Sequence, residues 1–374
     1  MDSITDRLRE TDAARARAWL RSLRDAVHDP LLARYLAWKY GERRLLARAG
    51  HRYQAVCFRA PQAEVESVLG PLDATPAATT SHGAVSRLGL LVDTRLTNGH
   101  VYVMRRLSSG SRLAIDCRLG RYFGMLDTCS TLEIELRATL CEGSRDEASL
   151  DASLPLRKAA HEAAGGDPVM CGAGREAAVG LSMLVACKAR DGYRMRLARR
   201  GDGGLALGGG QFHVVPSGMF DFADARRDFN VLAKLREEYA EELFADCPGA
   251  LEYLDQLLAN GDAQLVLTGV AVNLLNLRPE ICTLLIIRAP EWFERARRAR
   301  LNDEFLPETT AGGFNGWVRL ADDERMIAEA GLEPEHMIPP GAAAFWMGVD
   351  ALRADLRFGL TRELTKANDA RKII

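Results

Sequence analysis

Three glutamates lie close together in one short segment of the chain. Glu238, Glu241 and Glu242 are spaced i, i+3 and i+4, and in a helix residues at this spacing share one face. Carboxylates this close repel one another by about 0.2–0.5 kcal/mol per pair. A hard divalent cation with oxygen ligands would relieve that repulsion. The spacing therefore predicts either a metal-binding face or, as the simpler interpretation, a solvated acidic face.

The segment that contains these glutamates runs from Gly208 to Asp246. A glycine-rich, strand-like opening leads through Pro216, Ser217 and Gly218 into a helix. The apolar residues of this helix recur at helical spacing and are expected to form its buried face: Leu232, Leu235, Tyr239 and Leu243. The glutamates are expected to lie on a different and narrower face.

The stretch over residues 192–246 resembles the signature of the Nudix hydrolases. In that family a strand and a glycine-containing turn precede a helix with an arginine, a glutamate, an apolar residue and a final pair of glutamates. Gly218 matches the glycine of the turn, and Glu238, Glu241 and Glu242 match the metal-binding glutamates. The resemblance implies a Nudix-like α/β/α sandwich with a mixed sheet. It also implies that the three glutamates and the backbone around Gly218 bind Mg²⁺ or Mn²⁺.

The same resemblance implies a reaction and a class of substrate. The three glutamates would be catalytic, and the substrate would be a small-molecule diphosphate, such as a nucleoside diphosphate derivative. The metal would bridge phosphate oxygens and generate hydroxide from bound water, so that water cleaves the phosphoanhydride. The expected protein is therefore a Nudix-type pyrophosphohydrolase.

The helix departs from the family pattern beside its glutamates. Glu237 stands where the family has arginine, and Arg236 lies one residue too early. A shift of one residue turns a side chain by about 100°, which would direct Arg236 toward the buried face. Phe244 and Ala245 follow in place of a glycine. An alternative function is therefore a non-catalytic Nudix-like protein that binds a nucleotide or another ligand and regulates a partner.

Some residues outside the helix are candidates for contact with the substrate. Arg199 and Arg200 end a predicted strand and are candidates for binding phosphate, although a solvated strand end is the simpler interpretation. Glu304 and Glu308 are candidates for the general base. Trp317 is either a stacking platform or a core residue.

Length and charge favour a globular protein with more than one domain. The chain has 374 residues and a net charge of −2, which suggests two domains and argues against nucleic acid as a partner. We predict an N-terminal α+β domain over residues 1–165 and a Nudix-like domain over residues 166–374. The first fifty residues are expected to be helices that pack on the rest of the chain or form a homodimer.

The cysteines and the apolar runs indicate a reduced compartment. None of the eight cysteines has the spacing of a zinc site, and most are expected to be buried thiols. The N-terminus is charged, and no apolar run approaches about 18 residues. A cytoplasmic protein without a membrane partner is expected. The excess of arginine over lysine and the abundance of alanine are typical of GC-rich bacterial genomes.

The pattern of the N-terminal half predicts helices followed by strands. Helical spacing predicts helices over 12–28, 31–50 and 129–140, and strands are predicted over 55–60, 87–96 and 100–107. Asn98 and Gly99 are expected to form a hairpin turn between the last two strands. Residues 142–172 are predicted to be a linker with one helix.

The C-terminal half is predicted to alternate strands and helices. Strands are expected over 180–189, 193–200, 212–220, 263–277 and 280–289, and helices over 251–261, 289–301, 323–331 and 342–356, besides the helix that carries the glutamates and includes Leu232 to Leu243. The strands over 263–277 and 280–289 are nearly continuous in apolar residues, as expected for a sheet covered on both faces. The order of strands followed by a helix also resembles that of the N-terminal half, which suggests a weak duplication with a degenerate Nudix-like first copy.

Overall fold

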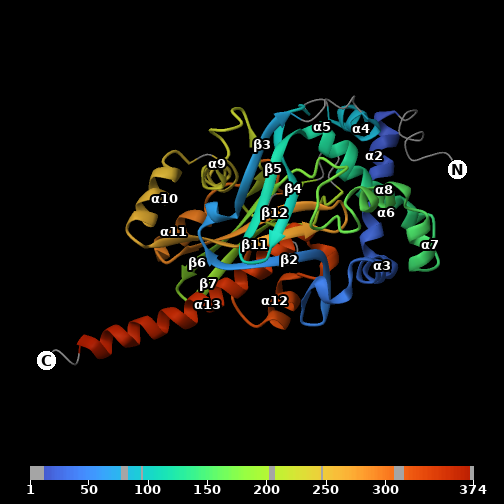
Figure 1. Cartoon of the computed structure of the whole chain (residues 1–374). Coiled ribbons are helices and arrows are strands. Elements are labelled where there is room, and N and C mark those ends of the chain that lie inside the picture. Colours follow the sequence, from blue (N-terminus) through green and yellow to red (C-terminus); the bar gives the residue numbers. More distant parts are fainter. Residues whose placement is uncertain are drawn as a thin grey trace.

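The chain folds around two connected β-sheets with helices on their outer sides (Figure 1). The structure is a computed structural model and describes residues 12–76, 83–93, 96–201, 207–245, 247–306 and 316–370. The strands of the larger sheet run in the order β1-β2-β11-β12-β6-β7-β13, with β8 paired to β7 and β9 paired to β6. The smaller sheet has the order β10-β4-β5-β3.

The larger sheet is mixed, because β12 and β6 are parallel while their other neighbours are antiparallel. Its strands are β1 (Leu45–Arg48), β2 (His51–Ala63), β6 (Gly180–Ala189), β7 (Gly192–Arg199), β8 (Phe212–Val214), β9 (Ser217–Met219), β11 (Ala263–Asn273), β12 (Arg278–Ile287) and β13 (Trp317–Arg319). The predicted strands over 180–189, 263–277 and 280–289 are thereby confirmed as β6, β11 and β12.

Helices cover both faces of this sheet. On one face, Phe345 and Trp346 of α13 (Pro339–Ala370) pack in a cluster with Leu184 of β6 and Leu284 of β12. α12 (Asp323–Ala330) contributes to the same cluster. Successive strand residues point to opposite faces, so the alternate residues of β6 and β12 pack against the other layer. The arrangement is an α/β sandwich with a mixed sheet.

The opposite face of the sheet is covered by three helices that follow β10 in the chain. These helices are α9 (Val231–Leu243), α10 (Ala250–Ala259) and α11 (Pro290–Ala296), and they lie together at the left of Figure 1. Leu235 and Tyr239 of α9 and Trp292 of α11 are buried in one cluster with Leu181 of β6 and Leu285 of β12. Leu235 and Tyr239, two residues of the apolar face predicted for α9, therefore point into the core.

The smaller sheet is formed by β3 (Leu69–Pro76), β4 (His100–Ser109), β5 (Leu113–Arg121) and β10 (Asp221–Phe222). Tyr102 of β4 donates its backbone N–H to the Phe220 carbonyl oxygen and accepts from the Val179 N–H, at 2.9 Å in each case. These bonds join the two sheets beside β9. The segment that leads into α9 therefore contributes strands to both sheets.

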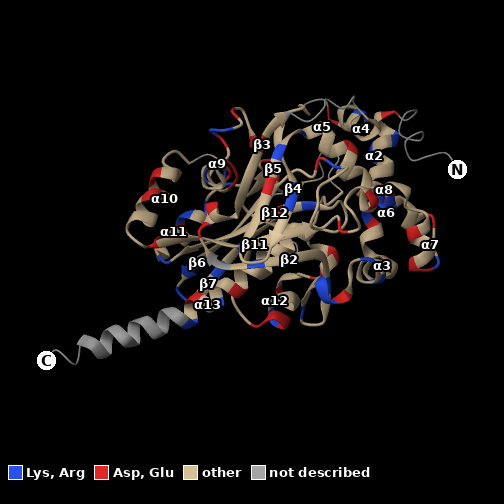
Figure 2. Ribbon diagram, viewed as in Figure 1, with Lys and Arg blue, Asp and Glu red and all other residues tan. Residues whose placement is uncertain are grey.

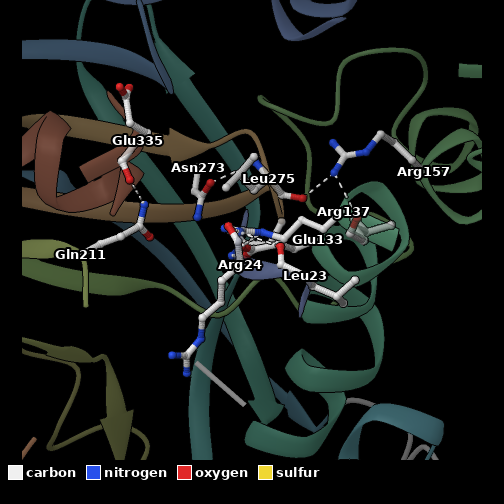
Figure 3. A network of polar contacts seen from close by, with 11 residues as sticks. Leu23, Arg24, Glu133, Arg137, Arg157, Gln211, Asn273, Leu275 and Glu335 are labelled. Atoms are coloured by element: carbon white, nitrogen blue, oxygen red, sulfur yellow. Dashed lines mark hydrogen bonds and ion pairs between the residues drawn. The ribbon is translucent and has the colours of Figure 1, made fainter. Parts of the chain in front are cut away.

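A helical layer borders the sheets at the right of Figure 1. It contains α2 (Ala13–Ser22), α3 (Pro30–Tyr40), α4 (Ala84–Val92), α5 (Tyr122–Met125), α6 (Thr131–Cys141), α7 (Glu147–Ala152) and α8 (Pro155–Ala163). Buried arginines tie this layer together. Arg157 of α8 donates to the hydroxyl of Tyr40 at 2.8 Å and to the carbonyl oxygens of Leu274 and Leu275 after β11. Figure 3 shows the bond to Leu275 and, beside it, the ion pair of Arg137 with Glu133.

Two predictions for the N-terminal half are wrong. The helix predicted over 31–50 ends at Tyr40, because Gly41 adopts a φ of 87°, and Leu45–Arg48 instead form an edge strand of the larger sheet. The strand predicted over 87–96 is helix α4, whose residues Val85, Leu88 and Val92 are buried at helical spacing. Tertiary packing selects the helical period here, and the element order of the two halves differs at this point.

Two further features concern the predicted division of the chain. The stretch over 142–172 contains two helices, α7 and α8, where one was predicted. Strands β1 and β2 precede residue 165 but belong to the same sheet as β6, β7, β11, β12 and β13. The boundary at 165/166 stays a prediction.

In the described part of the chain, no helix is both long and apolar enough to cross a bilayer.

Candidate functional site

Helix α9 carries the three glutamates, and its start and inner face are fixed locally. The side chain of Asn230 caps the helix by accepting from the Ala233 N–H at 2.7 Å. Leu235, Tyr239 and Leu243 are buried as predicted. Leu232 is 38% exposed, which corrects the prediction that it belongs to the buried face.

Glu238 lies against the backbone of β9. A Cβ atom on Gly218 would stand 2.2 Å from Glu238 Oε1, so only glycine leaves room for this carboxylate. Lys234, one turn earlier on α9, places Nζ 3.2 Å from the same oxygen. Lys234 also lies 2.9 Å from Asp221. Burial raises the pKa of Glu238, and the Lys234 charge opposes that rise.

Glu242 is the most deeply buried of the three glutamates. Its Oε2 accepts the backbone N–H of Ser217 at 2.7 Å, and Arg200 Nη1 lies 3.7 Å from its Oε1. Burial holds the pKa of Glu242 well above its ordinary value, although Arg200 and the Ser217 N–H favour the charged form. The carboxylate is thus held in place by one backbone bond and one guanidinium.

Glu241 lies outside this pair, on the exposed side of α9. Relative to Glu238, helical geometry turns Glu241 by about 60° in one sense and Glu242 by about 40° in the other. The inner face of the helix therefore takes Glu238 and Glu242 and leaves Glu241 at the rim. Among the described residues, no group of three or more His, Cys, Asp or Glu is arranged to hold a metal ion. The metal site of three glutamates stays a prediction.

The two arginines predicted at the end of a strand separate in the structure. Arg200 follows β7 and turns toward α9, with Nη1 also 2.7 Å from Glu304 Oε2 and its guanidinium over the ring of Phe305 at 5.3 Å. Arg199 is exposed and lies over the ring of Phe212 at 4.7 Å. Adjacent strand residues face opposite ways, so only Arg200 joins the glutamates.

The other candidates from the sequence have different outcomes. Glu304 is near the site through Arg200, whereas Glu308 lies outside the described residues. Trp317 is a core residue, since it is only 7% exposed and packs edge-on against Phe293 at 5.1 Å. Arg236, predicted to point inward, instead forms an ion pair with Asp255 of α10.

Two charged residues near the site were missed by the sequence analysis. Lys234 lies four residues before Glu238, and this i, i+4 spacing could have predicted their ion pair from the sequence. Glu280 is buried at the start of β12, beside Gly180 of β6, and accepts a hydrogen bond from the Ser182 hydroxyl. Burial raises the pKa of Glu280 to about 7, against the opposing effects of the Ser182 hydrogen bond and of the charges of Arg278 and Arg200. A single acid inside an apolar strand was its only signal.

Comparisons with known proteins do not assign the chain to a family. No protein-family model matches the sequence, and no curated protein matches it. Among solved structures, the chain is similar to C. elegans Ap4A hydrolase, with a TM-score of 0.23 and 12% sequence identity over 48% of this chain and 97% of that chain. A TM-score of this size carries no inference about fold or activity. The case for a function therefore rests on the residues around α9.

Proposed function

We propose that the protein hydrolyses the phosphoanhydride of a small-molecule diphosphate with the help of Mg²⁺ or Mn²⁺ at the α9 site. One observation carries the proposal: Glu238 and Glu242 are buried directly against the backbone of Ser217 and Gly218. A purely solvated acidic face would not bury two carboxylates, because desolvation disfavours their charged form. Burying them is reasonable where a cation is to be bound.

The oxygen atoms at this site are ligands that suit a hard divalent cation. The ligands would be the carboxylates of Glu238, Glu241 and Glu242 and the backbone carbonyl at Gly218, all of them oxygens. Burial raises the pKa of Glu238 and Glu242 although Lys234 and Arg200 oppose the rise, and a bound cation would favour the charged form of both carboxylates. When bound, the metal would neutralise phosphate charge and lower the pKa of a bound water.

The chain's own residues would position the reactants. The Ser217 N–H fixes one oxygen of Glu242, and Lys234 holds Glu238 over Gly218. Arg200 lies between Glu242 and Glu304, where its planar guanidinium can exchange one carboxylate for two oxygens of a phosphate. Arg199 would contact the substrate only at the rim, since it faces the other way.

A second candidate function has its own support. Glu238 and Glu242 already have cationic neighbours in Lys234 and Arg200, and Glu237 occupies the position of the family's arginine. These features favour a non-catalytic protein that uses the same surface to bind a nucleotide and regulate a partner. In that case the arginine would still bind phosphate, but the glutamates would take up no metal.

Phosphate release separates the two candidates. We expect the wild type to cleave at least one nucleoside diphosphate derivative in the presence of Mg²⁺ or Mn²⁺, followed as phosphate released when a phosphatase acts on the two phosphomonoester products. Glu241→Gln and Glu242→Gln should each lower kcat/KM by about 100-fold or more, equivalent to about 2.7 kcal/mol. Glu252→Gln, an exposed change on the neighbouring helix α10, is the matched control and should leave the rate unchanged.

Manganese binding, measured by electron paramagnetic resonance, gives a second readout that does not depend on turnover. Weaker Mn²⁺ binding in Glu241→Gln and Glu242→Gln would support the enzyme. Nucleotide binding without phosphate release and without Mn²⁺ uptake would support the regulatory protein. Phosphate release that is unchanged in both variants would contradict the assignment of the site.

A further inference from the structure

A pocket lies at the C-terminal end of α9, and none of the three glutamates lines it. It encloses about 570 Å³ and is lined by Phe244 and Cys247, which follow α9, and by residues of α11 and the segment after it. Cavities of about 300–1,000 Å³ are typical of small-molecule sites. The volume therefore suits a ligand of nucleotide size.

The wall contributed by α11 and its continuation is basic. Arg295, Arg298 and Arg300 all line the pocket and are exposed, and Figure 2 colours the basic residues of this segment blue. Glu294 is the one acidic residue among the described residues of the lining, and it forms an ion pair with Arg297 at 2.7 Å. Net positive charge therefore faces the cavity, and guanidinium groups match phosphate oxygens in geometry.

The present interactions of Arg295 and Arg300 are weak. Arg300 pairs with Asp303 at 2.6 Å, but the two side chains are 69% and 91% exposed, and such surface pairs contribute little. Arg295 donates to the Cys247 sulfur, a weak acceptor, at 3.1 Å and lies over the ring of Tyr253. A phosphate would therefore displace little when it binds.

The floor of the pocket is apolar and rigid. Phe244 is buried, with its ring 5.2 Å from that of Tyr239 and 5.9 Å from that of Trp292. The pocket thus combines an aromatic floor with a cationic rim. That combination fits a ligand with a flat apolar part and an attached phosphate.

We propose that this pocket binds a nucleotide, with its phosphates held by Arg295, Arg298 and Arg300 and its base against the Phe244 side. The site is separate from Glu238 and Glu242 and does not require the hydrolase proposal. Cys247 reports on it directly, because this partly exposed thiol lines the cavity. Cys141 is also exposed but lies on α6, next to Ser22 of α2, and serves as the internal control.

The test is alkylation of the full-length protein by iodoacetamide, with each cysteine followed by peptide mass spectrometry. EDTA is present throughout, so that metal-dependent binding at the α9 site does not contribute. We expect saturating ADP to slow alkylation of Cys247 about fivefold or more and to leave Cys141 unchanged. Adenosine, which lacks phosphate, should give no protection.

Isothermal titration calorimetry with ADP supplies the second arm. The double change Arg298→Gln and Arg300→Gln should weaken ADP binding about tenfold or more, equivalent to about 1.4 kcal/mol. Arg325→Gln, an exposed change on α12, should not alter it. Equal alkylation of Cys247 with and without ADP, equal protection by adenosine, or unchanged affinity in the double variant would each overturn the proposal.

Discussion

Replacing Glu280 by glutamine should make the protein more stable at alkaline pH. Glu280 is buried in β12, and a Cβ atom on Gly180 would lie 1.9 Å from its Oε2, so there is no room for a larger side chain. Glutamine has nearly the same volume. It can still accept the hydrogen bond that the Ser182 hydroxyl donates to Glu280. The substitution therefore removes the ionisation and leaves the packing.

The size of the effect follows from the pKa of this carboxyl. Burial raises it from 4.5 to about 7 in the folded protein. The folded state thus binds the proton more tightly than the unfolded state. The stability that this provides is fully present below about pH 4.5 and is lost as pH rises through about 7. The two pKa values differ by an amount equivalent to about 3 kcal/mol, an upper bound for this single group.

Urea unfolding of wild type and Glu280→Gln between pH 5 and pH 8 measures this effect. We expect the free energy of unfolding of the variant, relative to wild type, to rise by about 2–3 kcal/mol across this range. The comparison cancels the titration of groups common to both proteins, such as Glu238 and Glu242. Glu252→Gln, at an exposed position, should follow the wild type at every pH. Parallel curves for wild type and Glu280→Gln would refute the reasoning.

Two further changes test the packing around α9. Gly218→Ala places a methyl group 2.2 Å from Glu238 Oε1 and should lower the free energy of unfolding in urea by about 1–3 kcal/mol. Gly110→Ala is the control, because its methyl group would meet no atom within 4 Å. Equal effects of the two substitutions would contradict the close packing of Glu238 on Gly218. Tyr239→Phe removes the hydroxyl that accepts the Trp292 Nε1–H at 2.9 Å. Leaving that buried donor unpaired should cost about 1–3 kcal/mol, and an unchanged urea midpoint would show that another acceptor replaces it.

Local periodicity was enough to predict the elements of the site. The helix with its three glutamates was predicted to include Leu232 to Leu243 and is α9, Val231–Leu243. The apolar runs that became β6, β11 and β12 were identified as strands, because a sheet covered on both faces needs such runs. The resemblance assigned Gly218 to a turn before the helix, and in the structure Gly218 lies in the short strand β9. These features depend on neighbours close in the chain.

Periodicity failed where two periods fitted the same residues. The apolar residues of 87–96 suit a strand or a short helix, and only packing in the core selected helix α4. Leu232 has the right spacing for the inner face of α9 but lies at its edge, where no element covers it enough to bury it. The resemblance supplied the ligand set, but it did not indicate how the glutamates divide between core and solvent.

The sequence by itself determined that one helix carries three closely spaced carboxylates and begins after a strand and a glycine. Tertiary structure decided that Glu238 and Glu242 face β9 while Glu241 stays at the rim, and that Arg200 joins them while Arg199 does not. It also brought Glu280 beneath the same region from a strand far along the chain. The reason is physical: spacing along a helix is a local property, whereas burial and charge partners depend on elements that meet only when the sheet is formed.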